Sequence, residues 1–146
     1  MKNTFLAFVL LLTTIGFAQE KDYYIKKGAA VEGYDVVSYF DSKPTKGKKQ
    51  FTATYDGVKF LFASKKNLEK FNQSPKKYIP QYGGWCAYAL GKNNEKYSIN
   101  PETYEISDGK LYLFYNSWGI NTFKKWKEEN PGQLRKQADQ NWSALK

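Results

Sequence analysis

The 146-residue sequence contains no histidine, one cysteine (Cys86), one methionine (Met1) and one arginine (Arg135). A single cysteine cannot form an internal disulfide bond. Without histidine the chain lacks the commonest metal ligand and general base, and it cannot supply the four N or S ligands of an ordinary zinc site. These absences exclude a disulfide scaffold and a histidine-based centre. They leave Cys86 as the only soft metal ligand after the first residue.

Long apolar runs are also scarce, since the only one extends from Phe5 to Phe17. Its length of about 13 residues is below the roughly 20 that a membrane-spanning helix needs. Lys2 precedes the run, and small residues lie next to its end. This pattern predicts a bacterial signal peptide over residues 1–18 and a mature chain starting at Gln19, with an uncleaved membrane anchor as the alternative. We expect the mature protein to be periplasmic or secreted, without a membrane span.

Acidic residues are outnumbered, with 14 Asp and Glu against 23 Lys and Arg and a formal net charge of +9 at pH 7. A basic protein suggests nucleic-acid binding. The expected compartment, the dispersed lysines and the scarcity of arginine, which base readout favours, argue against it. We therefore expect no nucleic-acid partner. We interpret the charge as a solvated surface that is attracted to anionic components of the cell envelope.

Two segments have the pattern of β-hairpins. Strand-forming residues lie on both sides of Asp56-Gly57 within Gln50–Phe62, and on both sides of Asp108-Gly109 within Thr103–Asn116. Glycine accepts the positive φ that tight hairpin turns demand. A further short strand is expected at Val36–Phe40.

Helix signals separate and follow the two hairpins. Ser64 is a suitable N-cap for a helix that Pro75 ends. Residues 117–146 have a helical pattern that Pro131-Gly132 divides in two. The apolar segment Trp85–Leu90 fits either a strand or a helix. No repeat is visible at a period of about 20 to 50 residues, so the mature sequence predicts one α+β domain.

The segment YDGVKFLFASKKNLEKFNQSPKKY, Tyr55–Tyr78, resembles the core of the YHS domain, a family with two strands, a helix and an Asn-Pro-x-x-Tyr or similar ending. The residues that carry the resemblance are Tyr55, Asp56, Gly57, Phe60, Phe62, Ser64, Lys70, Phe71, Pro75, Lys77 and Tyr78. The resemblance implies a YHS-like core at residues 31–80 and a C-terminal helical extension over residues 81–146. Both belong to one domain over residues 19–146.

A longer resemblance, to small exported bacterial YHS proteins, rests on three further motifs. These are QYGGWCA (Gln81–Ala87), DGKLYL (Asp108–Leu113) and ADQNW (Ala138–Trp142). Other YHS domains bind metal through cysteines, as modules of heavy-metal pumps and related proteins. The corresponding positions of this sequence are Ser38, Ala63 and Asn67. The resemblance therefore does not carry over the family's cysteine metal site.

Several roles are open to Cys86. It can be a ligand for copper or haem iron, with Asp35 as a second metal ligand. It can be the contact of a small organic ligand. It can be the nucleophile of a thiol-dependent redox enzyme, although a histidine base and a resolving cysteine are missing. It can also be a small buried side chain with a packing role.

A candidate site is expected where Gly33–Asp35 approaches Gly83–Tyr88, with aromatic walls around a few polar groups. Its residues are Tyr34, Asp35, Tyr82, Trp85, Cys86 and Tyr88, of which Cys86 and Asp35 are the candidate metal ligands. The sequence predicts a non-enzymatic periplasmic protein that binds a metal ion, haem or a small ligand. The alternatives are a thiol-dependent redox enzyme and a structural or interaction protein that binds an envelope protein.

Overall fold

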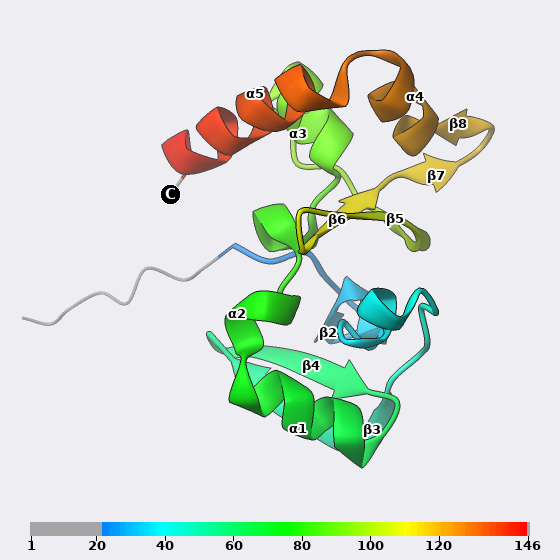
Figure 1. The fold of residues 1–146 in the computed structure, drawn as a ribbon, viewed down its shortest axis with the longest axis vertical. Helices are drawn as coiled ribbons and strands as arrows, with labels where there is room; N and C mark the ends of the chain where they lie inside the picture. Colours follow the sequence, from blue (N-terminus) through cyan, green and yellow to red (C-terminus); the bar gives the residue numbers. More distant parts are fainter. Residues whose placement is uncertain (1–21, 146) are drawn as a thin grey trace, which may run out of the picture.

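The computed structural model describes residues 22–145, so the predicted signal peptide lies outside the described residues. Two halves follow each other along the chain and form the lower and upper parts of Figure 1. The first half contains β1 (Ile25–Lys26), β2 (Ala29–Ala30), the 3-10 turns η1 (Val31–Gly33) and η2 (Ser38–Asp41), β3 (Lys48–Tyr55), β4 (Val58–Phe62), α1 (Lys65–Gln73) and α2 (Pro75–Tyr78). The second half contains η3 (Gln81–Gly84), α3 (Ala87–Asn93), β5 (Asn100–Ser107), β6 (Lys110–Phe114), β7 (Asn116–Ser117), β8 (Ile120–Asn121), α4 (Thr122–Glu128) and α5 (Pro131–Ala144). Helices and small antiparallel strand pairs occur together, which confirms the predicted α+β class.

The first half is built on the β3–β4 hairpin, which confirms the hairpin predicted at Asp56-Gly57. Both turn residues have positive φ, 52° and 78°, as a tight two-residue turn requires. Ser64 Oγ accepts a hydrogen bond from Asn67 N (3.1 Å) and caps α1, as predicted. Pro75 separates α1 from α2, because proline cannot donate the backbone hydrogen bond of a continuing helix.

The second half contains the other predicted hairpin, which turns at Asp108-Gly109 and joins β5 to β6. The apolar segment after Trp85 forms the helix α3. The side chains of Asn121 and Asn130 accept hydrogen bonds from the first turns of α4 and α5. Pro131 begins α5 and divides the two C-terminal helices, as predicted.

The backbone of the second half repeats that of the first. The β5–β6 pairing follows the β3–β4 pairing with every residue number raised by 52, from Lys48–Phe62 to Asn100–Phe114, and both ladders have an irregularity at the same place. Before each hairpin three consecutive residues have positive φ, at residues 31–33 (51°, 54° and 82°) and at residues 82–84 (57°, 61° and 91°). The segment after residue 80 therefore repeats the positive-φ segment and the hairpin of the first half.

Two local sequence predictions are wrong. Val36–Phe40 is not a strand, because the carboxylate of Asp35 accepts hydrogen bonds from the following backbone and folds it into the turn η2. Residues 117–121 are not helical, because Trp118 and Gly119 have φ of 52° and 76° and form the tight turn between β7 and β8. The helix α4 begins only after this hairpin.

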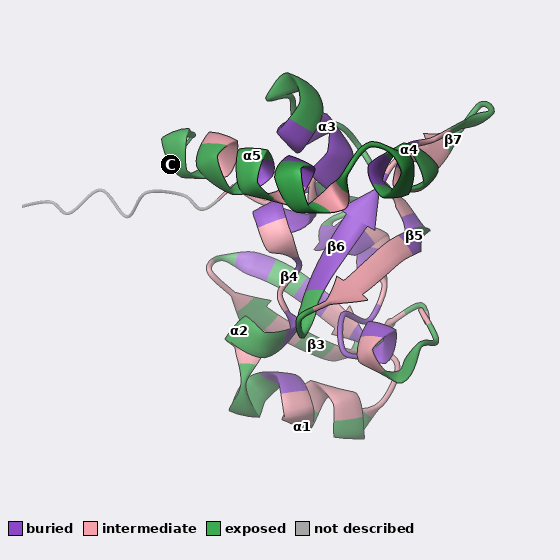
Figure 2. Cartoon of the chain, turned by 45° about the horizontal axis from the view of Figure 1, so that its top comes forward, coloured by how far each residue is buried: buried purple, intermediate pink, exposed green. Residues whose placement is uncertain are grey.

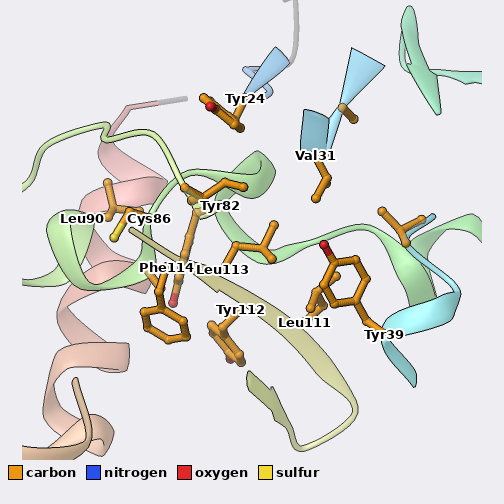
Figure 3. Packing of buried hydrophobic residues seen from close by; sticks show 14 of the residues in the cluster. Tyr24, Val31, Tyr39, Tyr82, Cys86, Leu90, Leu111, Tyr112, Leu113 and Phe114 are labelled. Carbon is orange, nitrogen blue, oxygen red and sulfur yellow. The ribbon is translucent and has the colours of Figure 1, made fainter. Parts of the chain in front are cut away.

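The core lies around β6, which contacts α2 of the first half and α3 of the second. Residues 111–114 are all buried (Figure 2), and since consecutive strand residues point to opposite faces, both faces of β6 are covered. Figure 3 shows Tyr82 and Cys86 on one side of the labelled cluster and Val31 and Tyr39 on the other. Within residues 22–145 no helix is long and apolar enough to cross a membrane.

Candidate functional site

Asp35 is fully buried, and its carboxylate is saturated with hydrogen bonds. Oδ1 accepts hydrogen bonds from Val37 N (2.9 Å) and Ser38 N (3.4 Å). Oδ2 accepts hydrogen bonds from Ala63 N (2.9 Å) and Asn67 Nδ2 (2.7 Å). The donors come from the start of η2, the end of β4 and the first turn of α1. A buried charge is tolerable only when hydrogen-bonded in this way, so Asp35 joins three elements of the first half.

The three positions at which the YHS resemblance places cysteines surround this carboxylate. Ser38 and Ala63 donate their backbone N–H groups to it, and Asn67 donates its side-chain amide. A carboxylate has about four acceptor positions. The four donors occupy them, so a network of hydrogen bonds stands where the resemblance places thiols.

Cys86 is also fully buried. Its Sγ accepts a hydrogen bond from Tyr115 N (3.3 Å) and lies 3.3 Å from Thr122 Oγ1. Because the Thr122 hydroxyl donates to Tyr115 O (2.9 Å), the thiol S–H is the donor to Thr122 Oγ1. The thiol is therefore a donor and an acceptor inside the core. This environment supports the packing role among the roles open to Cys86.

Asp35 and Cys86 have corresponding places in the two halves, 51 residues apart. Each follows the three residues of positive φ. Each accepts a hydrogen bond from the peptide N–H that comes directly after the second hairpin strand, which is Ala63 N in the first half and Tyr115 N in the second. The two side chains have no hydrogen-bond partner in common, so the structure does not join them in one polar cluster.

The metal hypothesis has no cluster of ligands to support it in the described part of the chain. Within residues 22–145 no group of three or more histidine, cysteine, aspartate or glutamate side chains is placed to hold a metal ion. Metal or haem binding through Cys86 or Asp35 stays a prediction.

The four aromatic candidates are dispersed. Tyr34 is half-buried and takes part in an isolated β-bridge. Trp85 is half-buried and donates its indole N–H to a carboxylate of the N-terminal segment. Tyr88 Oη donates to Glu129 Oε1 (2.9 Å), and burial followed by this hydrogen bond raises the pKa of Tyr88 to about 12. Tyr82 is the one candidate that lines the large cleft described next.

A cleft of about 630 Å³ opens between the two halves. Its walls are the N-terminal segment, the β3–β4 turn, the chain from α2 to η3, the start of β6 and the end of α5. The lining residues are Asp22, Tyr23, Tyr55, Asp56, Lys76, Ile79, Pro80, Gln81, Tyr82, Gly83, Lys110, Asp139, Trp142, Ser143 and Leu145. The volume lies in the range of roughly 300–1,000 Å³ that small-molecule sites have.

Tyrosine–aspartate pairs hold opposite walls of the cleft. Tyr23 Oη donates to Asp56 Oδ2 and Tyr82 Oη donates to Asp139 Oδ1, both at 2.8 Å. Burial, and then the hydrogen bond to Asp139, raises the pKa of Tyr82 well above its ordinary value. The pairs therefore keep their hydroxyl protons at neutral pH and fix the orientation of both carboxylates.

Two lysines of the cleft are not in ion pairs with other described residues. Lys76 and Lys110 line the cleft with exposed side chains. None of the ion pairs among residues 22–145 involves either lysine. The cleft thus combines an aromatic wall with two lysines outside any ion pair of the described residues, and with the carboxylates of Asp22, Asp56 and Asp139.

The buried tyrosines give a prediction for alkaline solution. Burial raises the pKa of Tyr39 and Tyr82 above the ordinary value of 10.0, so above pH 10 the unfolded chain releases these protons while the folded protein keeps them. Their contribution to stability is complete below pH 10 and falls by about 1.4 kcal/mol per pH unit and per tyrosine above it. We expect the free energy of unfolding to fall by roughly 5 kcal/mol between pH 10 and pH 12 from these two groups.

Two measurements test the predicted loss of stability above pH 10. Absorbance at 295 nm reports phenolate formation, and far-UV circular dichroism reports unfolding. We expect the phenolate signal of the buried tyrosines to appear in the same transition as unfolding. Complete phenolate formation at pH 11 with native circular dichroism would contradict the burial of these hydroxyls. The Tyr39→Phe variant should show a shallower dependence of stability on pH.

Residues 36–82 match the model of the YHS domain family. This part of the chain is therefore a YHS domain, as the sequence suggested. The matched range begins directly after Asp35 and ends at Tyr82, so it covers the four hydrogen-bond donors to Asp35 and part of the cleft wall. A search of curated proteins and a search of solved structures each gave no match.

Sequence reasoning missed the cleft because its walls come from segments that are far apart in the chain. The available signal was the Ala138–Trp142 motif. Asp139 and Trp142 line the cleft, and Asn141 Nδ2 between them donates to Leu90 O in the middle of α3 (2.7 Å). The motif therefore fixes α5 on α3 and presents the neighbouring side chains to the cleft.

Proposed function

We propose that this YHS domain-containing protein is an exported, non-enzymatic binding protein that holds a small organic anion in the cleft between its two halves. The observation that carries the proposal is the position of Lys76 and Lys110 beside the aromatic wall, outside the ion pairs of the described residues. The nearby carboxylates of Asp56 and Asp139 each accept a tyrosine hydrogen bond. An anionic group on the ligand can pair with the two lysines, which hold no acidic side chain of the described residues within ion-pair distance.

The aromatic wall of the cleft determines which chemical group can accompany the anionic group of the ligand. Tyr55 and Trp142 are half-buried side chains at the cleft. Half-buried rings offer a flat apolar surface on which an aromatic or apolar body can pack. The ligand class is thus an organic acid with an apolar or aromatic body, of a size that fills part of about 630 Å³.

The proposed location follows from the predicted signal peptide. The full-length chain, expressed in a bacterium with its own N-terminus, should appear in the periplasm or the medium with the mass of residues 19–146. Native mass spectrometry of the protein, purified without chelator, measures this mass and any bound molecule together. A cytoplasmic protein with the mass of the whole chain would contradict export.

The anionic aromatic dye 1-anilinonaphthalene-8-sulfonate tests the cleft. We expect the protein to bind the dye and the variant Ser143→Trp to bind it at least about tenfold more weakly, because an exposed residue of α5 then fills the cleft. Gln140→Trp is the matched control, since Gln140 is exposed on the same helix and does not line the cleft. Lys76→Gln combined with Lys110→Gln should also weaken binding.

Two results would overturn the proposal. One is dye binding that Ser143→Trp leaves unchanged. The other is a copper(I) or haem adduct in the native mass spectrum that disappears in Cys86→Ser while the Ser143→Trp variant keeps it. The second result would move the site from the cleft to the thiol.

A further inference from the structure

The most exposed large apolar side chain among the described residues is Trp118, which is 93% exposed. It lies at the tip of the β7–β8 hairpin, which projects from the body of the protein beside α4 (Figure 2). The first half passes from β4 to α1 through Ala63 and Ser64 alone. The hairpin is therefore an addition to the repeated architecture, and its largest side chain contributes nothing to the core.

The turn itself is a strained place for a tryptophan. Four two-residue hairpin turns of this chain have a glycine at the second position, preceded by Lys27, Asp56, Asp108 or Trp118 with φ between 51° and 56°. Asparagine, aspartate and glycine are favoured at this first position, whereas a bulky residue with positive φ is strained. Folding would be served better by asparagine. The requirements of the turn therefore do not account for an indole at this position.

The surroundings of the hairpin indicate the chemistry of that contact. Ile120 on β8 is 47% exposed, and Tyr97 is 51% exposed and packs edge-on against Tyr115 beside the start of β7. Lys124 is exposed in the first turn of α4, directly after the hairpin, as is Lys125. Neither lysine is in an ion pair with another described residue.

Aromatic side chains and lysines outside any ion pair of the described residues together match the surface of an anionic membrane. Indole and phenol rings are enriched at the level of lipid headgroups. Lysines near a membrane surface are attracted to anionic lipids over about a Debye length. A hairpin with two-residue strands is too short to cross a bilayer, so the contact it can make is peripheral.

We infer that the β7–β8 hairpin docks the protein on a membrane surface that contains anionic lipid. Trp118 enters the headgroup layer, and Lys124 and Lys125 face the lipid phosphates. This docking surface does not include the residues that line the cleft, so the inference stands or falls independently of the proposed ligand.

Co-flotation with vesicles tests the inference on the mature full-length protein. We expect binding to vesicles of 60% phosphatidylcholine and 40% phosphatidylglycerol, roughly tenfold weaker binding after Trp118→Asn, and a loss of similar size after Lys124→Glu with Lys125→Glu. Pure phosphatidylcholine vesicles should bind far less protein. Lipids brominated near the headgroup should quench tryptophan fluorescence of the wild type and not of Trp118→Asn.

Matched controls separate docking from folding and from net charge. Trp118→Asn places a favoured residue in the turn, so its thermal stability should equal or exceed that of the wild type. Lys65→Glu with Lys66→Glu changes the net charge by the same amount on exposed positions of α1 in the other half, and should leave most of the binding intact. Equal binding of Trp118→Asn, or equal losses in both lysine pairs, would overturn hairpin docking. Wild-type protein that does not bind the anionic vesicles would also overturn it, and an envelope protein lost from Trp118→Asn in that case would identify a protein partner instead.

Discussion

Replacement of Asp35 by alanine should lower the free energy of unfolding by about 4 kcal/mol or more. The substitution leaves four donors without their acceptor, namely Val37 N, Ser38 N, Ala63 N and Asn67 Nδ2. A buried polar group that loses its partner costs about 1–3 kcal/mol. Urea unfolding monitored by circular dichroism measures the change, and for a domain with the usual stability of roughly 5–15 kcal/mol it approaches complete unfolding.

Asp35→Asn refines the same test, because it keeps the shape and one acceptor oxygen but turns an NH₂ group toward two donors. We expect an intermediate loss of about 2–3 kcal/mol. Asp41→Ala is the control, since Asp41 is exposed at the end of η2 and should change stability by less than about 0.5 kcal/mol. A stable, native-like Asp35→Ala variant would show that the carboxylate is not the centre of the first half.

Replacement of Trp126 by alanine should cost about 3–5 kcal/mol, as truncation of a fully buried tryptophan does. The ring packs against Phe114, with centroids 5.3 Å apart, and against Tyr112, with centroids 6.1 Å apart. Its Nε1 donates to Glu105 Oε2 (3.1 Å), so Trp126→Phe should keep most of the packing and lose about 1 kcal/mol for the hydrogen bond. Chemical unfolding of Trp126→Ala and Trp126→Phe measures the contributions of ring packing and of the hydrogen bond separately.

Trp118→Asn is the natural control for this experiment, because it removes the same side chain from an exposed turn. Equal destabilisation by Trp126→Ala and Trp118→Asn would contradict the burial of Trp126 in the second half's core. Tryptophan fluorescence can also follow the unfolding of both variants. The chain has four tryptophans, and Trp85 and Trp142 are present in each variant.

Most local structure was predictable because it depends on neighbours in the sequence. The turns at Asp56-Gly57 and Asp108-Gly109, the Ser64 cap and the breaks at Pro75 and Pro131 follow from backbone sterics and short-range hydrogen bonds. The local predictions failed where one side chain changed the backbone conformation that the surrounding sequence pattern predicts. Hydrogen bonds to Asp35 fold an apolar segment into a turn. Trp118 lies at a turn position where asparagine or aspartate is usual, so the sequence did not indicate the β7–β8 turn.

The repeat of the two halves escaped sequence analysis for a physical reason. The repeated feature is a backbone arrangement with one buried side chain that accepts a hydrogen bond from the peptide N–H after the hairpin. A carboxylate performs this role at Asp35 and a thiol at Cys86, so the chemistry is conserved while the residue type is not. The single cysteine is therefore explained by a structural role that no motif around it would reveal.

By itself the sequence determined the absence of a disulfide framework, the α+β class, the hairpin turns and the YHS domain at residues 36–82, because these depend on composition and on residues close together in the chain. Only the tertiary structure decided that Asp35 and Cys86 are separate, buried counterparts and that the cleft lies elsewhere. Burial, hydrogen-bond saturation and the exposure of Trp118 are set by contacts between residues far apart in sequence, and such contacts exist only once the two halves have packed around β6.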